Sequence, residues 1–479
     1  MSIKGAQRSS IGQQAFRFPI MGSLTVGSWI WAFPSPGVKE TRTLRIGPNE
    51  LHIDDPSVLR TIYGPNYNFR KDPTFYSGFT PHTVFTELEP ARHKELRKIQ
   101  SSFFSKQKIA KIQHLLDKEV NHFCEKLTMV KSQGPVHLSK AVRCLTVDII
   151  SEYAFAQCFN ALDETSGPKF EWPLIKALDI ALEVVIDFVY VPGLHWFADH
   201  ASRKLSLMIN PKIKNFFDFQ DLLTVCCMQT AGAIVKGFRE SSQDKESRTH
   251  IPLFQAISSL SDEALLNEAI TLITAGSDTT ATTLGVAVYE ILSDQTIKDK
   301  LIMELDQSIV DRNSMPPLQQ LEQLQYLSAC IKEALRVATA APVRLPRVVP
   351  AAGVCVLQVD NKVIPPGSIV GMSSYTIHFD EDIWGPDAQV FRPERWLGDN
   401  AKHLDPYLVP FSTGIRQCIG MKLFSLAYAE LRITLAKLFR MFDLSLDPTL
   451  DPEDLTTLDY FVATYKGDGV RIIVEGERV

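Results

Sequence analysis

A segment near the end of the chain, residues 411–420 (FSTGIRQCIG), has the residue types that a metal–thiolate site requires. Cys418 lies just before a predicted helix over 420–440. The free N–H groups and the dipole of that helix favour an anion, so we expect a lowered thiol pKa and a stable thiolate. A lone cysteine is more often a buried structural residue, but the full spacing of this segment favours an iron ligand.

Four neighbours of the cysteine support the same interpretation. Gly414 permits a backbone turn that is closed to residues with a β-carbon, and Gly420 removes side-chain bulk where a flat ligand must approach. Phe411 can shield the sulfur from water. Arg416 can direct a fixed positive charge at an acidic group of the ligand.

A second segment breaks the local rules for a buried helix. Residues 261–292 are predicted to form a long apolar helix, yet residues 275–280 (AGSDTT) place a glycine, an acid and hydroxyls in its middle. Ala275 and Thr279 are i, i+4 and share one face, so the Thr279 hydroxyl could bond back to the Ala275 carbonyl and open a groove. A functional site and a kink packed against polar neighbours both fit this segment alone.

One further pair of residues carries opposite charges at helical spacing. Glu333 and Arg336 are i, i+3 in a predicted helix over 319–338 and can pair on one face. Taken alone, such a pair is most often a solvated salt bridge.

Taken together, four ordered motifs resemble those of the cytochrome P450 family, over roughly residues 45 to 479. The segment 411–420 matches F-x-x-G-x-R-x-C-x-G at every fixed position, and 275–280 is similar to the oxygen-activating helix motif. Glu333 to Arg336 match E-x-x-R, and residues 391–396 (FRPERW) match the later arginine motif. The resemblance implies haem b with Cys418 as its axial ligand, and a mainly α fold with small β-sheets. The haem would lie between a long distal helix and the cysteine loop with its proximal helix.

The resemblance also implies roles for individual residues. Asp278 and Thr279 would deliver protons during oxygen activation, and the small Ala275 would let the helix lie close over the haem. Arg395 would join Glu333 and Arg336 in a buried network. The haem propionates need cations, for which the resemblance implies a set of candidates: Arg97, Arg347 and Arg416, with His93 four residues before Arg97 as a further contact. Alternatively, Arg97 and His93 would lie on an exposed helix face and would not contact the propionates.

The remaining elements are mostly helical. Helical periodicity is seen at 91–104, 108–131 and 138–157, and residues 45–65 are typical of a strand, a turn and a short helix. Short strands are predicted at 353–358, 362–364 and 469–474. The sequence therefore predicts a mainly helical protein with small sheets clustered in its second half.

Composition limits the function classes. The 479 residues are 45% hydrophobic and 22% charged, with a net charge of −5 and no run of five like charges, so no nucleic-acid partner is expected. The eight cysteines form no C-x-x-C pair. No Gly-rich dinucleotide motif follows a strand, so electrons should come from a separate NADPH–cytochrome P450 reductase. Lysines that could dock it are Lys94, Lys98, Lys422 and Lys437, although a solvated face is the more usual explanation.

We expect two regions: an atypical N-terminal segment, 1–44, and a catalytic domain, 45–479. No stretch of eighteen apolar residues exists, but Trp29, Trp31 and Phe33 could rest in a membrane interface. The resemblance then implies the cytosolic face of the endoplasmic reticulum membrane. Residues 1–44 resemble neither the membrane helix nor the proline-rich hinge with which the family usually begins.

The subgroup resemblance is to fungal secondary-metabolism members near trichodiene oxygenase. It rests on 45–56 (RIGPNELHIDDP), 103–107 (FFSKQ), 363–367 (VIPPG) and 468–471 (DGVR). The implied reaction is insertion of one oxygen atom of O2 into an apolar small molecule, such as a terpenoid or polyketide. The apolar stretch 181–197 could roof the substrate pocket or could be plain core. Two rivals remain: a haem-thiolate isomerase or dehydratase, which the Asp278–Thr279 pair disfavours, and a non-catalytic haem-binding sensor.

Overall fold

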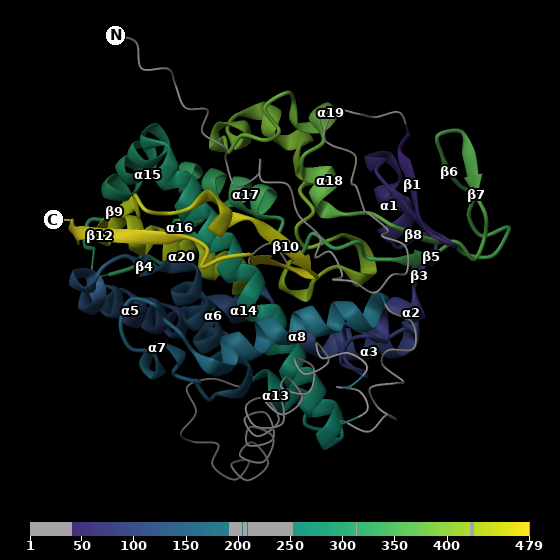
Figure 1. The fold of residues 1–479 in the computed structure, drawn as a ribbon, viewed down its shortest axis with the longest axis horizontal. Helices are drawn as coiled ribbons and strands as arrows, with labels where there is room; N and C mark the ends of the chain where they lie inside the picture. The colour runs from purple at the N-terminus through teal and green to yellow at the C-terminus, as the bar shows by residue number, and fades with distance from the viewer. Residues whose placement is uncertain are drawn as a thin grey trace.

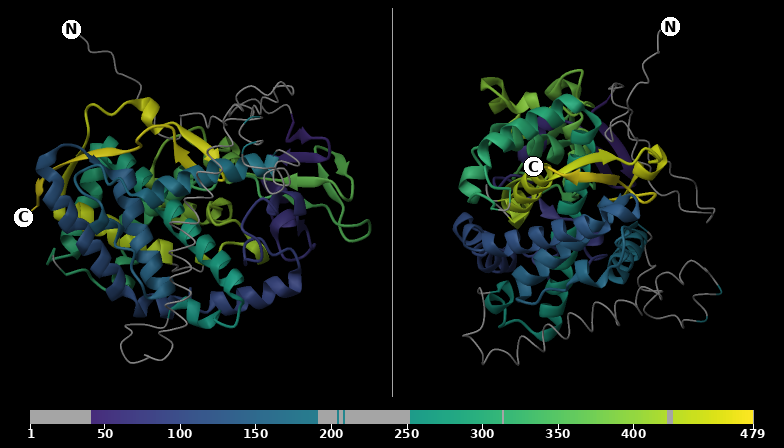
Figure 2. Two further views of the ribbon diagram at one scale, coloured as in Figure 1. Left: turned by 60° about the horizontal axis from the view of Figure 1, so that its bottom comes forward. Right: turned by 90° about the vertical axis from the view of Figure 1, so that its left-hand side faces the viewer.

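The computed structural model describes residues 41–190, 204, 208, 252–312, 314–421 and 426–478. A long helix, α14 (Asp262–Ser293), passes through the middle of the helical body, and the largest sheet lies to one side of it (Figure 1). The expectation of a mainly α fold with small β-sheets is confirmed, and the two further views show the same helical mass around α14 (Figure 2).

The described helices vary from single turns to 32 residues. They are α1 (Leu59–Tyr63), α2 (Pro73–Tyr76), α3 (Pro90–Ser101), α4 (Lys106–Lys111), α5 (Gln113–Val130), α6 (Leu138–Phe155), α7 (Ala161–Glu164), α8 (Pro173–Tyr190), α13 (Leu253–Ala256), α14, α15 (Gln295–Ser308), α16 (Leu318–Leu321), α17 (Gln325–Ala338), α18 (Ser374–His378), α19 (Glu381–Trp384) and α20 (Leu426–Met441).

The described strands are all short. They are β1 (Thr43–Gly47), β2 (Glu50–Ile53), β3 (Arg70–Lys71), β4 (Val136–His137), β5 (Arg347–Val348), β6 (Leu357–Val359), β7 (Lys362–Ile364), β8 (Ile369–Gly371), β9 (Phe442–Leu446), β10 (Thr457–Tyr460), β11 (Val462–Tyr465) and β12 (Arg471–Glu477).

Helix α14 is defined at its start by a side-chain cap. Ser261 accepts a hydrogen bond from the Ala264 N–H, and Asp262 and Glu263 place negative charge in the first turn, where the helix dipole favours it. Its apolar residues are buried on most sides, because α6, α17 and α20 pack around it. This burial holds α14 in a defined position in the core.

The sheets join segments that are far apart in the sequence. One sheet has the order β1-β2-β8-β5-β3, in which only β2 and β8 are parallel. Its β3–β5 pair sets Lys71 directly opposite Arg347. A second sheet, β4-β12-β9, ties the start of α6 to the C-terminal strands. The register of β3 on β5 therefore places two cations side by side, since opposite residues share one face.

Several element boundaries differ from the sequence expectation. The helix expected over 108–131 is interrupted at Ile112, where α4 ends and α5 begins. Directly after this break, the Gln113 side chain donates to Pro316 O at 3.0 Å and accepts from Leu318 N at 2.8 Å. The helix expected over 319–338 is likewise divided into α16 and α17. Residues 45–65 hold two strands rather than one.

The expected N-terminal segment, 1–44, lies outside the described residues except for 41–44, and so does part of the stretch 181–197. Among the described helices, none combines the length and the apolar character needed to cross a bilayer.

Candidate active site

The loop that carries Cys418 is tightly constrained. Gly414 has φ +78°, and a β-carbon there would lie 1.9 Å from the Tyr63 carbonyl oxygen, so only glycine fits. The Cys418 N–H donates to Phe411 O at 2.9 Å. A β-carbon on Gly420 would lie 3.3 Å from the Cys418 sulfur, so this glycine keeps one side of the sulfur clear.

The expected lowering of the Cys418 pKa is wrong for the protein alone. Burial raises the pKa of the Cys418 thiol above its usual 9.0, and this outweighs the Gly420 N–H and the Arg97 charge, which lower it. The Cys418 side chain still keeps an exposed surface. Desolvation therefore dominates, and the two lowering groups are not enough to make a thiolate without a further positive charge.

Helix α14 presents Ala275 and Thr279 on a surface that is not fully packed. Ala275 is exposed in the middle of a largely buried helix, and the Thr279 hydroxyl donates to Ala275 O at 3.0 Å. The neighbouring Gly276 has a packing role, because a β-carbon there would lie 2.7 Å from Ile150 of α6. The back-bond is shared with Thr271, Thr274 and Thr283, so the exposure of Ala275 is the more specific signal.

Asp278 is held by an arginine that the sequence did not reveal. Arg143 Nε of α6 donates to Asp278 Oδ1 at 2.9 Å, and the other end of its guanidinium pairs with Asp179 of α8 at 2.8 Å. Burial raises the pKa of Asp278, Arg143 lowers it, and the like charge of Asp179 raises it again. Asp278 Oδ2 is buried without a hydrogen-bond partner among the described residues.

A cluster of cations lies beside the cysteine loop. Arg97 Nη1 donates to Gln417 O at 2.6 Å, and Arg416 Nη1 donates to Glu87 O at 2.6 Å. Arg347 is 3% exposed and donates to the Tyr76 hydroxyl at 2.9 Å. The structure thus brings together the three arginines that were singled out from the sequence.

His93 and Lys71 complete this cation cluster. Burial, together with the charges of Arg416, Lys71, Arg97 and Arg347, lowers the pKa of His93 to about 3, so its imidazole is neutral. Burial, followed by the charges of Arg347, Arg416 and Arg97, also holds the pKa of Lys71 well below 10.5, and Glu87 only partly opposes this. Sequence reasoning missed Lys71, because its place opposite Arg347 depends on strand pairing.

The cation cluster fits a ligand with two carboxylates. Like charges directly opposite on a sheet are destabilising. Among the described residues, the charge of Glu87 acts on both Lys71 and Arg416 and partly offsets this repulsion. Glu87 is itself paired with Arg92 at 3.2 Å. The planar forks of arginines can bind carboxylates such as propionates, and an imidazole N–H and a lysine can add further hydrogen bonds.

A buried ionic network lies behind the cysteine loop. The Glu333 carboxylate, 0% exposed, accepts from Arg336 Nη2 at 2.7 Å and from Arg395 Nε at 2.8 Å. It also accepts from Trp396 Nε1 at 2.8 Å and from the Arg392 N–H at 2.9 Å. Arg336 donates onward to His378 O and Ala388 O. The network joins α17 to the segment that precedes the cysteine loop.

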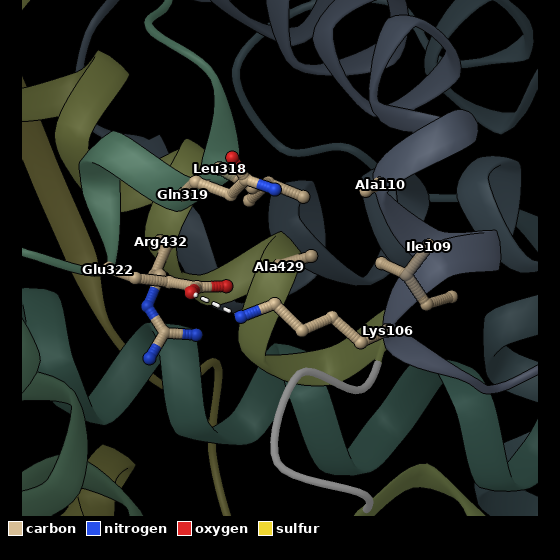
Figure 3. Close-up of a pocket in the computed structure, with 8 residues that line it drawn as sticks. All are labelled: Lys106, Ile109, Ala110, Leu318, Gln319, Glu322, Ala429 and Arg432. Carbon is tan, nitrogen blue, oxygen red and sulfur yellow. Dashed lines mark hydrogen bonds and ion pairs between the residues drawn. The ribbon is translucent and has the colours of Figure 1, made fainter.

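The four lysines considered for docking differ in their exposure. Lys94 and Lys98 are exposed on α3, Lys437 is buried and donates to Arg312 O at 3.0 Å, and Lys422 lies outside the described residues. Lys437 is therefore not available for docking. Figure 3 shows a pocket between α4, α16 and α20, where Lys106 pairs with Glu322 at 3.0 Å. Its volume is about 10 Å³. It can hold at most one water, so it is not a substrate site.

Comparison with known proteins agrees with this arrangement. The cytochrome P450 family model matches residues 43–470, and the chain belongs to this family. It is 32% identical to cytochrome P450 monooxygenase macH of Penicillium terrestre, over 89% of this chain and 82% of that protein. It is also 32% identical to cytochrome P450 monooxygenase tpcC of Cochliobolus heterostrophus, over 87% and 79% of the two chains.

A third relative is cytochrome P450 monooxygenase astB of Aspergillus terreus, 30% identical over 88% of this chain and 82% of that protein. The expected family, its fungal kinship and the enzyme class, a cytochrome P450 monooxygenase, are confirmed. Membership implies haem, and enzymes of this class use O2 and a redox partner.

Proposed function

We propose that this chain is a haem-thiolate monooxygenase that hydroxylates or epoxidises an apolar terpenoid or polyketide in fungal secondary metabolism. The observation that carries the proposal is the cation cluster at the cysteine loop, where Arg97 bonds to Gln417 O next to Cys418. A cation cluster that can bind an anionic ligand, beside the exposed thiol of Cys418, suits haem b.

The residues that would hold haem b follow from this cluster. Cys418 would be the iron ligand, and iron would supply the positive charge that its raised thiol pKa requires. Arg97, Arg347 and Arg416 would bind the propionates, with His93 as a neutral donor and Lys71 as a further cation. Bound in this way, haem supplies the oxygen-activating chemistry of the reaction.

The protein's own task is to position groups and to move protons. Ala275 adds little side-chain bulk to the surface of α14, and Thr279 presents a hydroxyl there that donates to Ala275 O. Asp278, whose pKa is raised by burial, can hold and release a proton in the interior. We assign proton delivery to Asp278 and Thr279, and we assign to Arg143 the task of holding Asp278 in place.

The network of Glu333, Arg336 and Arg395 would be structural, because it fixes the segment that leads into the cysteine loop. Electrons would come from NADPH–cytochrome P450 reductase, with Lys94 and Lys98 of α3 on the docking face. Residues 45–479 would form the catalytic domain, and residues 1–44 would contact the cytosolic surface of the endoplasmic reticulum membrane.

The test uses purified, haem-loaded protein and reductase. The reduced protein should give the red-shifted carbon monoxide spectrum of a thiolate ligand, and Cys418→Ala should lose it. With an apolar substrate, NADPH and O2 should be consumed. A spectrum retained in Cys418→Ala would refute the ligand assignment. Turnover without reductase would favour an isomerase or dehydratase, and no consumption with any substrate would favour a sensor.

A further inference from the structure

Three phenyl rings from distant parts of the chain meet beside the candidate site. Phe79 follows α2, Phe85 precedes α3, and Phe461 forms the turn between β10 and β11. The ring centroids lie 5.5 Å apart for Phe79 and Phe85, 4.9 Å for Phe79 and Phe461, and 5.4 Å for Phe85 and Phe461. Each pair is edge to face, which sets a positive ring edge against a negative ring face. We call these three rings the phenyl cluster.

The surroundings of the phenyl cluster are apolar. It packs with Phe75 and Tyr76 of α2 and Val189 of α8, and α2 lies beside the end of α8 (Figure 1). The approach is close, since a β-carbon on Gly78 would lie 2.5 Å from Val189 Cγ2. The three phenyl rings are only partly buried, whereas Phe75 is fully packed. The cluster therefore keeps ring surface available for contact.

The backbone is strained where Phe461 enters the cluster. Phe461 has φ +76°, a conformation that is costly for a bulky residue and persists only where the surroundings enforce it. Asp459 Oδ1 accepts the Phe461 N–H at 2.9 Å, and Ala463 N–H donates to Ala340 O at 2.9 Å. Strain of this kind is concentrated at ligand-binding sites, and here it aims a phenyl ring at the other two.

Two contacts connect the phenyl cluster to α14 and to the cation cluster. Val84, adjacent to Phe85, donates its N–H to Glu268 of α14 at 2.7 Å. Glu268 lies seven residues before Ala275, on the same face of the helix and about 10 Å along it. On the other side, Lys71 of the cation cluster lies 4.7 Å from the centre of the Phe85 ring. The phenyl cluster thus contacts the cation cluster through Lys71 and, through Val84, the part of α14 that precedes Ala275.

Resting on the proposed monooxygenase function, we propose that the phenyl cluster binds a flat aromatic ring system of the substrate. Phenyl faces and edges attract the edges and faces of another aromatic ring, beyond simple burial of apolar area. A saturated polycycle of the same carbon skeleton offers only C–H surface and gains burial alone. The enzyme should therefore select aromatic small molecules against their saturated counterparts.

The test compares 2-naphthol with decahydro-2-naphthol by isothermal titration calorimetry of the haem-loaded protein. Both ligands have ten ring carbons and one hydroxyl. Hydrophobicity alone favours the saturated ligand, because it carries more C–H surface. Burial of apolar area and aromatic ring contacts therefore predict opposite orders of affinity for the two ligands. We expect 2-naphthol to bind about fivefold to tenfold more tightly.

The variants Phe79→Leu, Phe85→Leu and Phe461→Leu keep apolar surface but remove the ring. Each should bring the affinity ratio towards about one while leaving decahydro-2-naphthol affinity within about twofold. Phe159→Leu is the matched control, because Phe159 is also partly buried and contacts two rings, Phe155 and Trp172, away from the site. This control should keep the ratio of the parent protein.

Equal or tighter binding of the saturated ligand by the parent protein would overturn the inference, and so would an unchanged ratio in all three variants. The carbon monoxide spectrum of the same preparation separates this failure from that of the proposed function. A normal thiolate spectrum with no preference for 2-naphthol would refute only the aromatic-binding inference. An absent thiolate spectrum would refute the proposed function, and calorimetry would still measure the ligand preference.

Discussion

Glu333→Gln should destabilise the protein strongly, although it changes a single atom. The carboxylate accepts five hydrogen bonds, with Arg336 Nε, Arg336 Nη2, Arg395 Nε, Trp396 Nε1 and the Arg392 N–H as donors. An amide nitrogen at the Oε2 position would face two of these donors, and at the Oε1 position three. Two guanidinium groups would also lose their counter-charge in a fully buried site. Breaking such a network costs roughly 3–5 kcal/mol, a large share of a total stability of about 5–15 kcal/mol.

Denaturant unfolding, followed by tryptophan fluorescence and the haem absorbance, measures this loss. Glu394→Gln is the matched control, since Glu394 is 37% exposed and its pair with Lys300 should contribute no more than about 1 kcal/mol. Burial raises the pKa of Glu333, but the Arg336 charge and the hydrogen bonds lower it by more, to below 4.5. The network's contribution should therefore be complete near neutral pH and fall as the pH drops below about 4.5. A loss in Glu333→Gln no larger than that of the control would refute the reasoning.

Three other predictions concern the site. Thr279→Ala should divert electrons to peroxide, and an unchanged ratio of product to NADPH would contradict the role of its hydroxyl in proton delivery. Lys71→Met should relieve repulsion in the cation cluster, so the haem-free protein should become more stable to denaturant. The same variant should lose haem faster to apomyoglobin. A change in neither quantity would exclude Lys71 from the electrostatics of the cluster. Burial raises the pKa of Glu268 from 4.5 to about 7, so the folded state holds an extra proton and stability should fall by about 3 kcal/mol as pH rises from about 5 to 8. Glu268→Gln can still accept the Val84 N–H and should abolish this fall, which urea midpoints across that range would show.

Sequence spacing was sufficient wherever the chemistry is local. The turn at Gly414, the i, i+3 relation of Glu333 and Arg336, and the back-bond from Thr279 to Ala275 follow from backbone geometry within one loop or one helix. Helix boundaries were less predictable, as at Ile112, where α4 ends and Gln113 at the start of α5 bonds to the distant segment 316–318.

Tertiary structure alone decided which groups act on these local motifs. Arg143 reaches Asp278 from α6, Lys71 meets Arg347 through strand pairing, and Phe461 joins Phe79 and Phe85 across most of the chain. The sign of the pKa shift at Cys418 also depended on packing, since desolvation exceeds the local N–H and arginine influences. The physical reason is range: backbone rise and turn geometry act over a few residues, whereas burial and charge act through space and require the folded chain.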